Sequence, residues 1–481
     1  MSPKSILAVL AFIILAIGIL MASSVLVSLL HDGKDLVPLA LSSGASIVAG
    51  GALWFVLRKH RNEVGIRDGF VIVSLGWVAA SLFGCLPFVL SGAIPSFTDA
   101  FFETMSGFTT TGATILTDIE DLPYGILYWR SLTQWIGGLG IILLSVAILP
   151  LLGVGGMQLF KAEVPGVTVE KITPRISQTA RILWLVYVLL TLLQTLLLLW
   201  AGLPLFDAVC HAFTTVSTGG FSTKNASIAY YESPAVEIII IIFMFLAGVN
   251  FTLHYRALKG EFTSYLRDGE FKFYVLLIVG VTVLVFFGIP TLTSSELGWQ
   301  IRAGLFQVVS IVTTTGYVTA DYELWVPAVQ LLLLLMMLSG ACAGSTAGGI
   351  KLVRVIVLLK NGLNQMKALL HPRAVIPVRH NGRTVGQDII VDVLAFLVLY
   401  ITLFALATIV MSATGLDMVS AAGSVAATIG NIGPGLGSVG AIDNYAHVPD
   451  FGKWVLTFCM LTGRLELFTV LVLFTPSFWR R

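Results

Sequence analysis

Charged side chains are scarce in this chain of 481 residues, since only 11% are Asp, Glu, Lys or Arg while 57% are hydrophobic. A soluble domain carries about 25% charged residues. The chain therefore has too few charges to cover a water-facing surface, which excludes an ordinary soluble protein. The formal net charge of +2 gives no indication of a nucleic-acid partner.

Motifs for catalysis and for cofactor binding are also missing. The chain has no G-x-x-x-x-G-K-[ST] for a nucleotide phosphate, no H-E-x-x-H for zinc and no G-x-S-G serine motif. Its cysteines (Cys85, Cys210, Cys342 and Cys459) form no C-x-x-C pair and fall in apolar or loop segments. This pattern predicts neither a metal site nor a disulfide framework. The sequence therefore indicates neither an enzyme nor a protein with an organic cofactor.

Long apolar runs are abundant, and many approach the roughly 20 residues that cross a bilayer. They predict ten spans, over residues 5–30, 36–58, 69–91, 128–153, 181–202, 234–256, 272–290, 325–358, 389–414 and 452–477. Most Lys and Arg residues fall in the connections on one side of these spans. By the positive-inside rule, that side and both termini are cytoplasmic. We therefore expect an integral membrane protein surrounded by lipid.

Four connections on the opposite side are long and mildly apolar: residues 92–127, 203–233, 291–324 and 415–451. Each holds an apolar stretch that is too short to cross, followed by a turn rich in Thr and Gly. Such a pattern is typical of a re-entrant helix and loop. Irregular backbone is tolerated at membrane depth only where it is buried in protein or lines a water-filled cavity.

The four turns align with one another and recur about every 100 residues. They read Gly107-Phe-Thr-Thr-Thr-Gly112-Ala113, Thr214-Thr-Val-Ser-Thr-Gly219-Gly220, Ile311-Val-Thr-Thr-Thr-Gly316-Tyr317 and Ala426-Ala-Thr-Ile-Gly430-Asn431. The alternative is four unrelated turns, or glycines that only pack helices together. The repetition favours four copies of one unit, each made of a span, a re-entrant loop and a second span.

The residue types of the turns suit a dehydrated cation, which needs a cage of oxygen atoms. Backbone carbonyls provide that cage if the chain can turn them inward, and glycine permits the positive φ angles that this requires. Four turns around one axis would form rings of carbonyls that replace the hydration shell. The C-terminal end of each short helix adds a partial negative charge. Asp99, Asp207 and Asp417 are expected to stabilise the other ends of these helices without contacting the ion.

Further motifs follow the turns: Gln134-Trp-Ile-Gly-Gly-Leu-Gly-Ile-Ile, Ala247-Gly-Val-Asn-Phe-Thr-Leu-His254, Ala343-Gly-Ser-Thr-Ala-Gly-Gly-Ile-Lys351 and Gly430-Asn-Ile-Gly-Pro-Gly435. With the turns, they resemble the TrkH/TrkG/KtrB family of potassium transporters over nearly the whole chain. Two extra N-terminal spans make the resemblance to TrkH greater than to KtrB. The resemblance implies K+ as the transported ion.

The resemblance also implies the fold: an all-α polytopic membrane protein with four M1–pore-loop–M2 repeats in pseudo-fourfold symmetry around one pore, plus two extra N-terminal transmembrane helices. The boundaries would be an extension over 1–68, repeat 1 over 69–160, repeat 2 over 181–258, repeat 3 with a broken M2 over 272–360, a cytoplasmic linker over 361–388 and repeat 4 over 389–481.

Carried onto this chain, the family's selectivity filter would hold K+ by twelve backbone carbonyls. They are those of Thr110, Thr111, Gly112, Ser217, Thr218, Gly219, Thr314, Thr315, Gly316, Thr428, Ile429 and Gly430. Plant relatives that prefer sodium have serine at the first glycine, so Gly112 argues for potassium.

The span over 325–358 is too long for one helix, because 34 residues would extend about 51 Å at 1.5 Å per residue across a core of roughly 30 Å. Its middle is rich in glycine, which disfavours a helix. We expect a flexible loop over 339–349 that obstructs the pore when closed, with the gate residues Gly340, Gly344, Ser345, Thr346, Gly348 and Gly349. The alternative is a small-residue packing face between helices.

Arg464 falls near the middle of the last predicted span, where a charge is costly and usually faces the interior. The family has a matching arginine that faces the pore, so Arg464 is expected to contribute to the gate as an electrostatic barrier. The alternative is a structural ion pair with Glu466 or Glu103.

The resemblance further implies a homodimer in the bacterial cytoplasmic (inner) membrane. It also implies a separate cytosolic regulatory partner, a nucleotide-binding TrkA-like ring that docks on basic loops such as 359–383. An alternative function is an ion-coupled (H+ or Na+) secondary potassium symporter, although such transporters are usually built from inverted halves.

Overall fold

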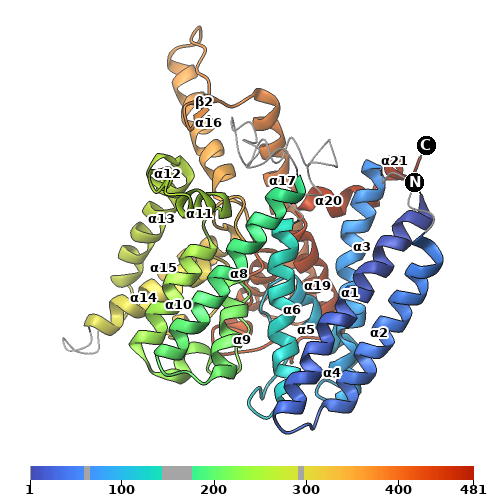
Figure 1. Ribbon diagram of the computed structural model, residues 1–481. Helices are drawn as coiled ribbons and strands as arrows, with labels where there is room; N and C mark the ends of the chain where they lie inside the picture. Colours follow the sequence, from blue (N-terminus) through green and yellow to red (C-terminus); the bar gives the residue numbers. More distant parts are fainter. Residues whose placement is uncertain (1, 59–64, 144–175, 291–296, 481) are drawn as a thin grey trace.

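The computed structural model describes residues 2–58, 65–143, 176–290 and 297–480. These residues are predominantly helical (Figure 1), as predicted. The strands found among them are β1 (Arg379–His380) and β2 (Arg383–Thr384), which pair antiparallel in a small hairpin. In Figure 1 both termini lie at the same end of the molecule as the projection formed by this hairpin and α16 (Leu352–Leu370).

The N-terminal helices α1 (Pro3–Leu30) and α2 (Leu36–Leu57) form a closely packed pair. A Cβ atom added to Gly50 would lie 2.4 Å from the backbone nitrogen of Leu15, so the two backbones meet at this glycine. The hydroxyl of Ser43 donates to the carbonyl of Gly18 at 2.8 Å across the same interface. Small residues at a helix crossing are the usual means of close packing in membranes.

The rest of the chain repeats one order four times: a long helix, a short buried helix and a further helix that is often broken. The first set is α3 (Ile66–Gly84), α4 (Leu86–Ser91), α5 (Phe97–Phe108) and α6 (Tyr124–Leu143). The second is α8 (Ile176–Trp200), α9 (Leu205–Val216), η3 (Ser227–Tyr231), α10 (Pro234–Ala247) and α11 (Phe251–Leu258). The third is α12 (Thr263–Arg267), α13 (Gly269–Phe286), α14 (Leu297–Val312), η5 (Tyr322–Leu324), α15 (Pro327–Leu338) and α16. The fourth is α17 (Gln387–Ala413), α18 (Met418–Ile429), η6 (Gly437–Val439), α19 (Asp450–Arg464), α20 (Leu467–Leu471), η7 (Val472–Phe474) and α21 (Pro476–Trp479).

Within the described residues, six helices are long and apolar enough to cross a membrane, or up to eight if two sharply bent pairs each count as one span. The expected spans over 234–256 and 452–477 correspond to these two bent pairs, so neither is one continuous helix. The first bends by 102° between α10 and α11, and the second bends by 118° after Arg464. The end of the expected span over 128–153 lies outside the described residues.

Both bends have a local cause. The side chain of Asn250 accepts a hydrogen bond from the backbone nitrogen of Thr252 and so begins α11 as a new helix. At the second bend, Glu466 has a φ of 62°, which interrupts the helical backbone. The break expected within 325–358 is confirmed, because α15 ends at Leu338 and α16 begins at Leu352.

Candidate functional site

The short helices α5, α9, α14 and α18 end in the same backbone turn near the centre of the molecule. The second residue after each helix has a positive φ: 52° at Thr110, 55° at Thr218, 56° at Thr314 and 55° at Asn431. The fourth residue is a glycine with positive φ: 82° at Gly112, 77° at Gly220, 80° at Gly316 and 98° at Gly433. The agreement shows that the four turns share one conformation.

Hydrogen bonds back to the helix fix this conformation. In the first turn, the nitrogen of Thr110 donates to the carbonyl of Gly107 at 2.9 Å, and the nitrogen of Thr111 donates to that of Ser106 at 2.8 Å. The other three turns repeat both bonds. This is the Schellman ending of a helix, in which glycine usually takes the left-handed position. Here threonine takes that position three times, and such strained backbone tends to occur at functional sites.

The shared conformation corrects the alignment made from the sequence. Gly112 and Gly316 correspond to Gly220 and Gly433, not to Gly219 and Gly430. Gly430 is the right-handed residue that ends α18, and Thr428 and Ile429 lie within the last turn of that helix. Two adjacent glycines made the second turn ambiguous, and Asn431, which tolerates a left-handed backbone, concealed the register of the fourth.

The four turns lie against one another in a closed ring. A Cβ atom added to Gly112 would lie 2.2 Å from the carbonyl oxygen of Gly219 in the second turn, and a Cβ atom added to Gly220 would lie 1.9 Å from the carbonyl oxygen of Thr315 in the third. A Cβ atom added to Gly316 would lie 1.8 Å from the carbonyl oxygen of Ile432 in the fourth turn. A Cβ atom added to Gly433 would lie 2.7 Å from the carbonyl oxygen of Thr111 in the first. The contacts therefore run from the first turn to the second, third and fourth and back to the first. Glycine is required at each position both by φ and by space.

One pocket joins the four turns, because all four of these glycines line it together with Thr114, Arg130, Lys224 and Asp443. Beside the ring, the side-chain oxygens Thr110 Oγ1 and Asn431 Oδ1 are buried and have no hydrogen-bond partner within the described residues. The arrangement places oxygen atoms, and the partially negative ends of four helices, around one constriction. Such a constriction can coordinate a dehydrated monovalent cation.

Side chains behind the ring hold the turns in place. Gln134 of α6 donates from Nε2 to the carbonyl of Gly219 at 2.7 Å and accepts at Oε1 from the nitrogen of Phe221 at 3.0 Å. The hydroxyl of Tyr445 donates to the carbonyl of Gly433 at 2.8 Å. Sequence reasoning noted Gln134 only as part of a motif and missed Tyr445, since neither has a local signal for this role.

We call the segment 339–351, between α15 and α16, the intramembrane loop. It contacts three of the turns near the points where they leave their helices. Thr346 donates from Oγ1 to the carbonyl of Val216 at 3.1 Å, and the nitrogen of Gly348 donates to Thr314 Oγ1 at 2.7 Å. A Cβ atom on Gly348 would lie 2.5 Å from the carbonyl oxygen of Gly430. The predicted loop residues are thus gathered directly against the ring.

The remaining predicted residues of the loop shape its backbone. Gly344 and Gly349 have φ values of 72° and 64°, and Ser345 donates from its hydroxyl to the carbonyl of Cys342 at 2.6 Å. The nitrogen of Gly340 donates to the carbonyl of Ile350 at 2.8 Å, so the two ends of the loop meet.

Arg464 is the last residue of α19 and lies at the bend within the predicted span 452–477. It is 3% exposed and donates from Nη1 to the carbonyl of Thr346 at 2.7 Å. Its Nε and Nη2 atoms have no partner among the described residues. Of its two alternative partners, Glu103 pairs with Arg130 at 2.7 Å and Glu466 pairs with Arg354 at 3.0 Å.

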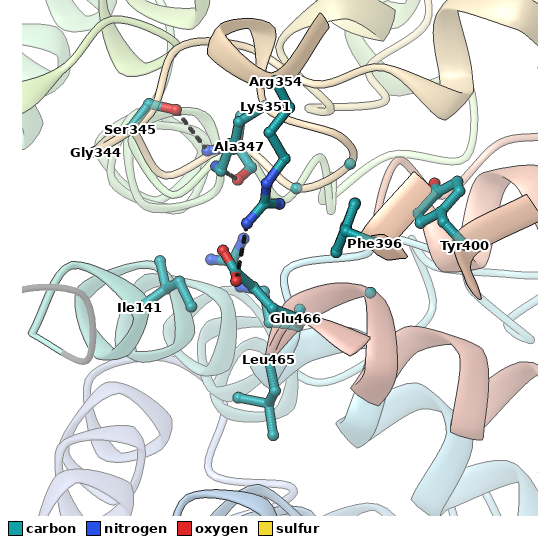
Figure 2. A pocket seen from close by; sticks show the side chains of 14 residues that line it. Ile141, Gly344, Ser345, Ala347, Lys351, Arg354, Phe396, Tyr400, Leu465 and Glu466 are labelled. Carbon is teal, nitrogen blue, oxygen red and sulfur yellow. Dashed lines mark hydrogen bonds and ion pairs between the residues drawn. The ribbon is translucent and has the colours of Figure 1, made fainter. Parts of the chain in front are cut away.

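A second pocket lies beneath the loop, lined by Gly344, Gly348, Lys351, Arg464 and Glu466 among others. Figure 2 shows Arg354 and Glu466 pointing toward each other across it. The loop and Arg464 therefore lie between this pocket and the ring of turns. We found no group of three or more His, Cys, Asp or Glu able to hold a metal ion in the described part of the chain.

The chain was compared with known proteins. The family TrkH, described as a cation transport protein, matches residues 40–481. The Trk system potassium uptake protein TrkH of Halomonas elongata is 42% identical over 484 residues, with 100% of both chains covered. Its counterpart in Escherichia coli strain K12 is 45% identical over 442 residues, covering 90% of each chain. The crystal structure of the potassium transporter TrkH from Vibrio parahaemolyticus matches with a TM-score of 0.91 and 38% identity over 100% of both chains.

Proposed function

The chain belongs to the TrkH family of cation transport proteins, and on this basis we propose that it takes up potassium across the cytoplasmic membrane through a channel-like pore. Membership of this family makes it a transport protein and not an enzyme. The observation that carries the proposal is the closed ring of four turns whose glycines line one pocket. Relatives named for potassium uptake support the choice of ion.

In this proposal, K+ is held by backbone carbonyls of the four turns in the register set by their positive φ angles. That register selects Thr110–Gly112, Thr218–Gly220, Thr314–Gly316 and the segment 431–433. Four residues of the set expected from the sequence fall outside this register and instead lie at the ends of α9 and α18: Ser217, Thr428, Ile429 and Gly430.

The test is ion flux through the purified protein in liposomes, with K+, Rb+, Na+ and Li+ compared. Carbonyl rings that replace the hydration shell of K+ should also accept Rb+ and disfavour the smaller ions. We expect flux of K+ and Rb+ to exceed that of Na+ and Li+. Absence of cation flux, or equal flux of all four ions, would contradict the proposal.

We further propose that the intramembrane loop and Arg464 form the gate. Two sets of contacts support this role: Thr346 and Gly348 bond to the turns, and Arg464 bonds to Thr346. They place the loop and Arg464 on the side of the ring that faces the second pocket. The charge of Arg464 would oppose a cation in a site of low dielectric constant. Opening then requires the loop to leave the ring.

We also propose the repeat boundaries, the orientation in the membrane and the partners of the chain. The boundaries expected from the sequence give an extension over 1–68 followed by four repeats. The end of the molecule that holds both termini and α16 would face the cytoplasm (Figure 1), and a nucleotide-binding regulatory ring would dock there on a homodimer. The basic residues of 359–383 support this orientation.

Coupled symport with H+ or Na+ is the alternative. The reversal potential of the current through the reconstituted protein separates the two mechanisms. A passive pore reverses at the potential set by the K+ gradient alone, whereas a symporter shifts that potential when the H+ or Na+ gradient changes.

A further inference from the structure

A buried ion pair lies behind the ring and is not needed for the function proposed so far. Glu103 of α5 is 1% exposed and Arg130 of α6 is 2% exposed. Arg130 donates from Nε to Glu103 Oε1 at 2.7 Å. The sequence suggested Glu103 only as an alternative partner of Arg464 and gave Arg130 no role, so this pairing was unexpected.

Each partner also holds the chain that leaves a turn. Glu103 accepts from the hydroxyl of Thr114 and from the backbone nitrogen of Ile115, both at 2.9 Å, and these residues follow Gly112. Arg130 donates from Nη1 to the carbonyl of Ser222 at 2.8 Å, and this residue follows Gly220. We call residues 113–115 and 221–223 the first and second outer arms.

The pair also lies at the pocket shared by the four turns. The guanidinium carbon of Arg130 lies 3.6 Å from the centre of the Phe221 ring, and Arg130, Thr114, Phe221 and Ser222 all line that pocket. One ion pair therefore joins α5, α6 and both outer arms, and fixes the distance between the first and second turns on their outer side.

The other turns have weaker connections at the equivalent position, five residues before the helix ends: His211, Gln307 and Ser424. His211 Nε2 lies 3.0 Å from Ser222 Oγ, and Gln307 donates to the carbonyl of Ala320 at 3.1 Å. Ser424 donates only within its own helix. A charged connection between two arms thus occurs, within the described residues, at the first and second turns.

Stability alone does not account for such a pair. Removing two charges from water costs about as much as their attraction returns, and apolar residues of similar volume are often as stable. Their bonds, however, have defined lengths and directions. The Arg130 guanidinium forks between a carboxylate and a carbonyl, a geometry that lysine cannot reproduce.

We propose that Glu103 and Arg130 are positioning residues that set the spacing of the first and second outer arms and thereby the preference for K+ over Na+. The inference rests on the proposed potassium transport. Glu103 also neutralises Arg130, whose positive charge would otherwise oppose cations entering the pocket.

The main test is the double variant Glu103→Gln/Arg130→Gln, reconstituted in liposomes, with the K+/Na+ permeability ratio as the readout. Loss of the charged hydrogen bonds between the arms should lower that ratio roughly tenfold. The single variant Glu103→Gln leaves Arg130 uncompensated and should reduce K+ flux more than the double variant does. A purely structural role would reduce flux of both ions equally and leave the ratio unchanged.

The matched control is Asp99→Asn/Lys453→Gln. Asp99 belongs to the same helix α5 and is paired at 2.5 Å with Lys453, which is 4% exposed, and this pair bonds to neither outer arm. The control should keep the wild-type ratio, and an equal fall in the control would overturn the inference.

Arg130→Lys covers the case in which the double variant does not fold. It keeps the charge beside Glu103 but cannot also reach the carbonyl of Ser222, so its ratio should fall as well. A wild-type ratio in Arg130→Lys, or in a folded double variant, overturns the inference while the wild-type flux still supports potassium transport. Absence of K+ flux in the wild-type protein would instead overturn the proposed function, and this inference with it.

Discussion

At the scale of single residues, the glycines of the turns have two separate requirements, a positive φ and the absence of a side chain. Gly112 illustrates both, with φ of 82° and a neighbouring carbonyl oxygen 2.2 Å from where its Cβ would be. The sequence could predict Gly112 and Gly316, because each ends an unbroken Thr-Thr-Thr run. It could not predict Gly433, whose role depends on where α18 ends.

We predict that Gly112→Ser abolishes the preference for K+, because the added side chain displaces the Gly219 carbonyl from the ring. The measurement is the K+/Na+ permeability ratio in liposomes. Gly92→Ser is the control, since Gly92 has φ of 74° but nothing within 4 Å of the added Cβ. The control should lose roughly 1–2 kcal/mol of stability through its left-handed backbone and keep its selectivity. A selective Gly112→Ser variant would show that the Gly219 carbonyl does not hold the ion.

Arg464→Ala should raise K+ flux severalfold and leave the K+/Na+ ratio unchanged. The substitution removes a positive charge from the proposed path and a hydrogen bond that holds the carbonyl of Thr346. Flux of 86Rb+ into liposomes measures the effect, and Arg302→Ala serves as a control because Arg302 pairs with Glu237, away from the loop. Lower flux with less folded protein would assign Arg464 a structural role instead.

At the scale of the elements, composition and length predicted where helices occur, and they predicted one of the breaks. Glycine disfavours a helix in the middle of the segment 325–358, and the structure has a break there between Leu338 and Leu352. The bends after Ala247 and Arg464 were missed, because the apolar pattern continues through both. Asn250 is a typical N-cap residue within the first of these apolar patterns, and it could have indicated the start of a new helix at that bend.

Deleting Gly340–Gly349 should increase K+ flux, because the deletion removes the segment that lies against the turns. The ends left by the deletion, Ser339 and Ile350, already pair in a β-bridge, so they can be joined with little movement of α15 and α16. Rubidium uptake into liposomes is the measurement. Unchanged flux in a folded deletion variant would show that the loop is not part of the gate.

A milder variant of the same element is Thr346→Val, which removes the hydroxyl bonded to the carbonyls of Val216 and Ala247. Its flux should rise by less than that of the deletion. Thr408→Val is the matched control, because Thr408 bonds only to Phe404 of its own helix.

At the scale of the whole molecule, the class of protein followed from the sequence because it depends on sums over many residues, such as charge content and apolar length. The ring of turns was expected, but its register was not. Register depends on contacts between residues about 100 positions apart, such as the approach of Gly220 to Thr315, and no local pattern encodes them. The pairing of Glu103 with Arg130 was missed for the same reason.

Orientation in the membrane is testable by labelling. The native cysteines are all buried, so an introduced cysteine should account for nearly all labelling by a membrane-impermeant maleimide. Arg373→Cys, exposed after α16, should react only in inside-out vesicles. Ile442→Cys, at a position 70% exposed beside the pocket shared by the turns, should react only in right-side-out vesicles. The reverse pattern would invert the proposed topology.

The central claim, that main-chain oxygens of the four turns hold a potassium ion, is tested most directly by anomalous diffraction from crystals grown in Rb+. We expect an anomalous peak inside the ring, within coordination distance of main-chain carbonyl oxygens of all four turns. Crystals that diffract well but show bound Rb+ only elsewhere, with none inside the ring, would contradict the account.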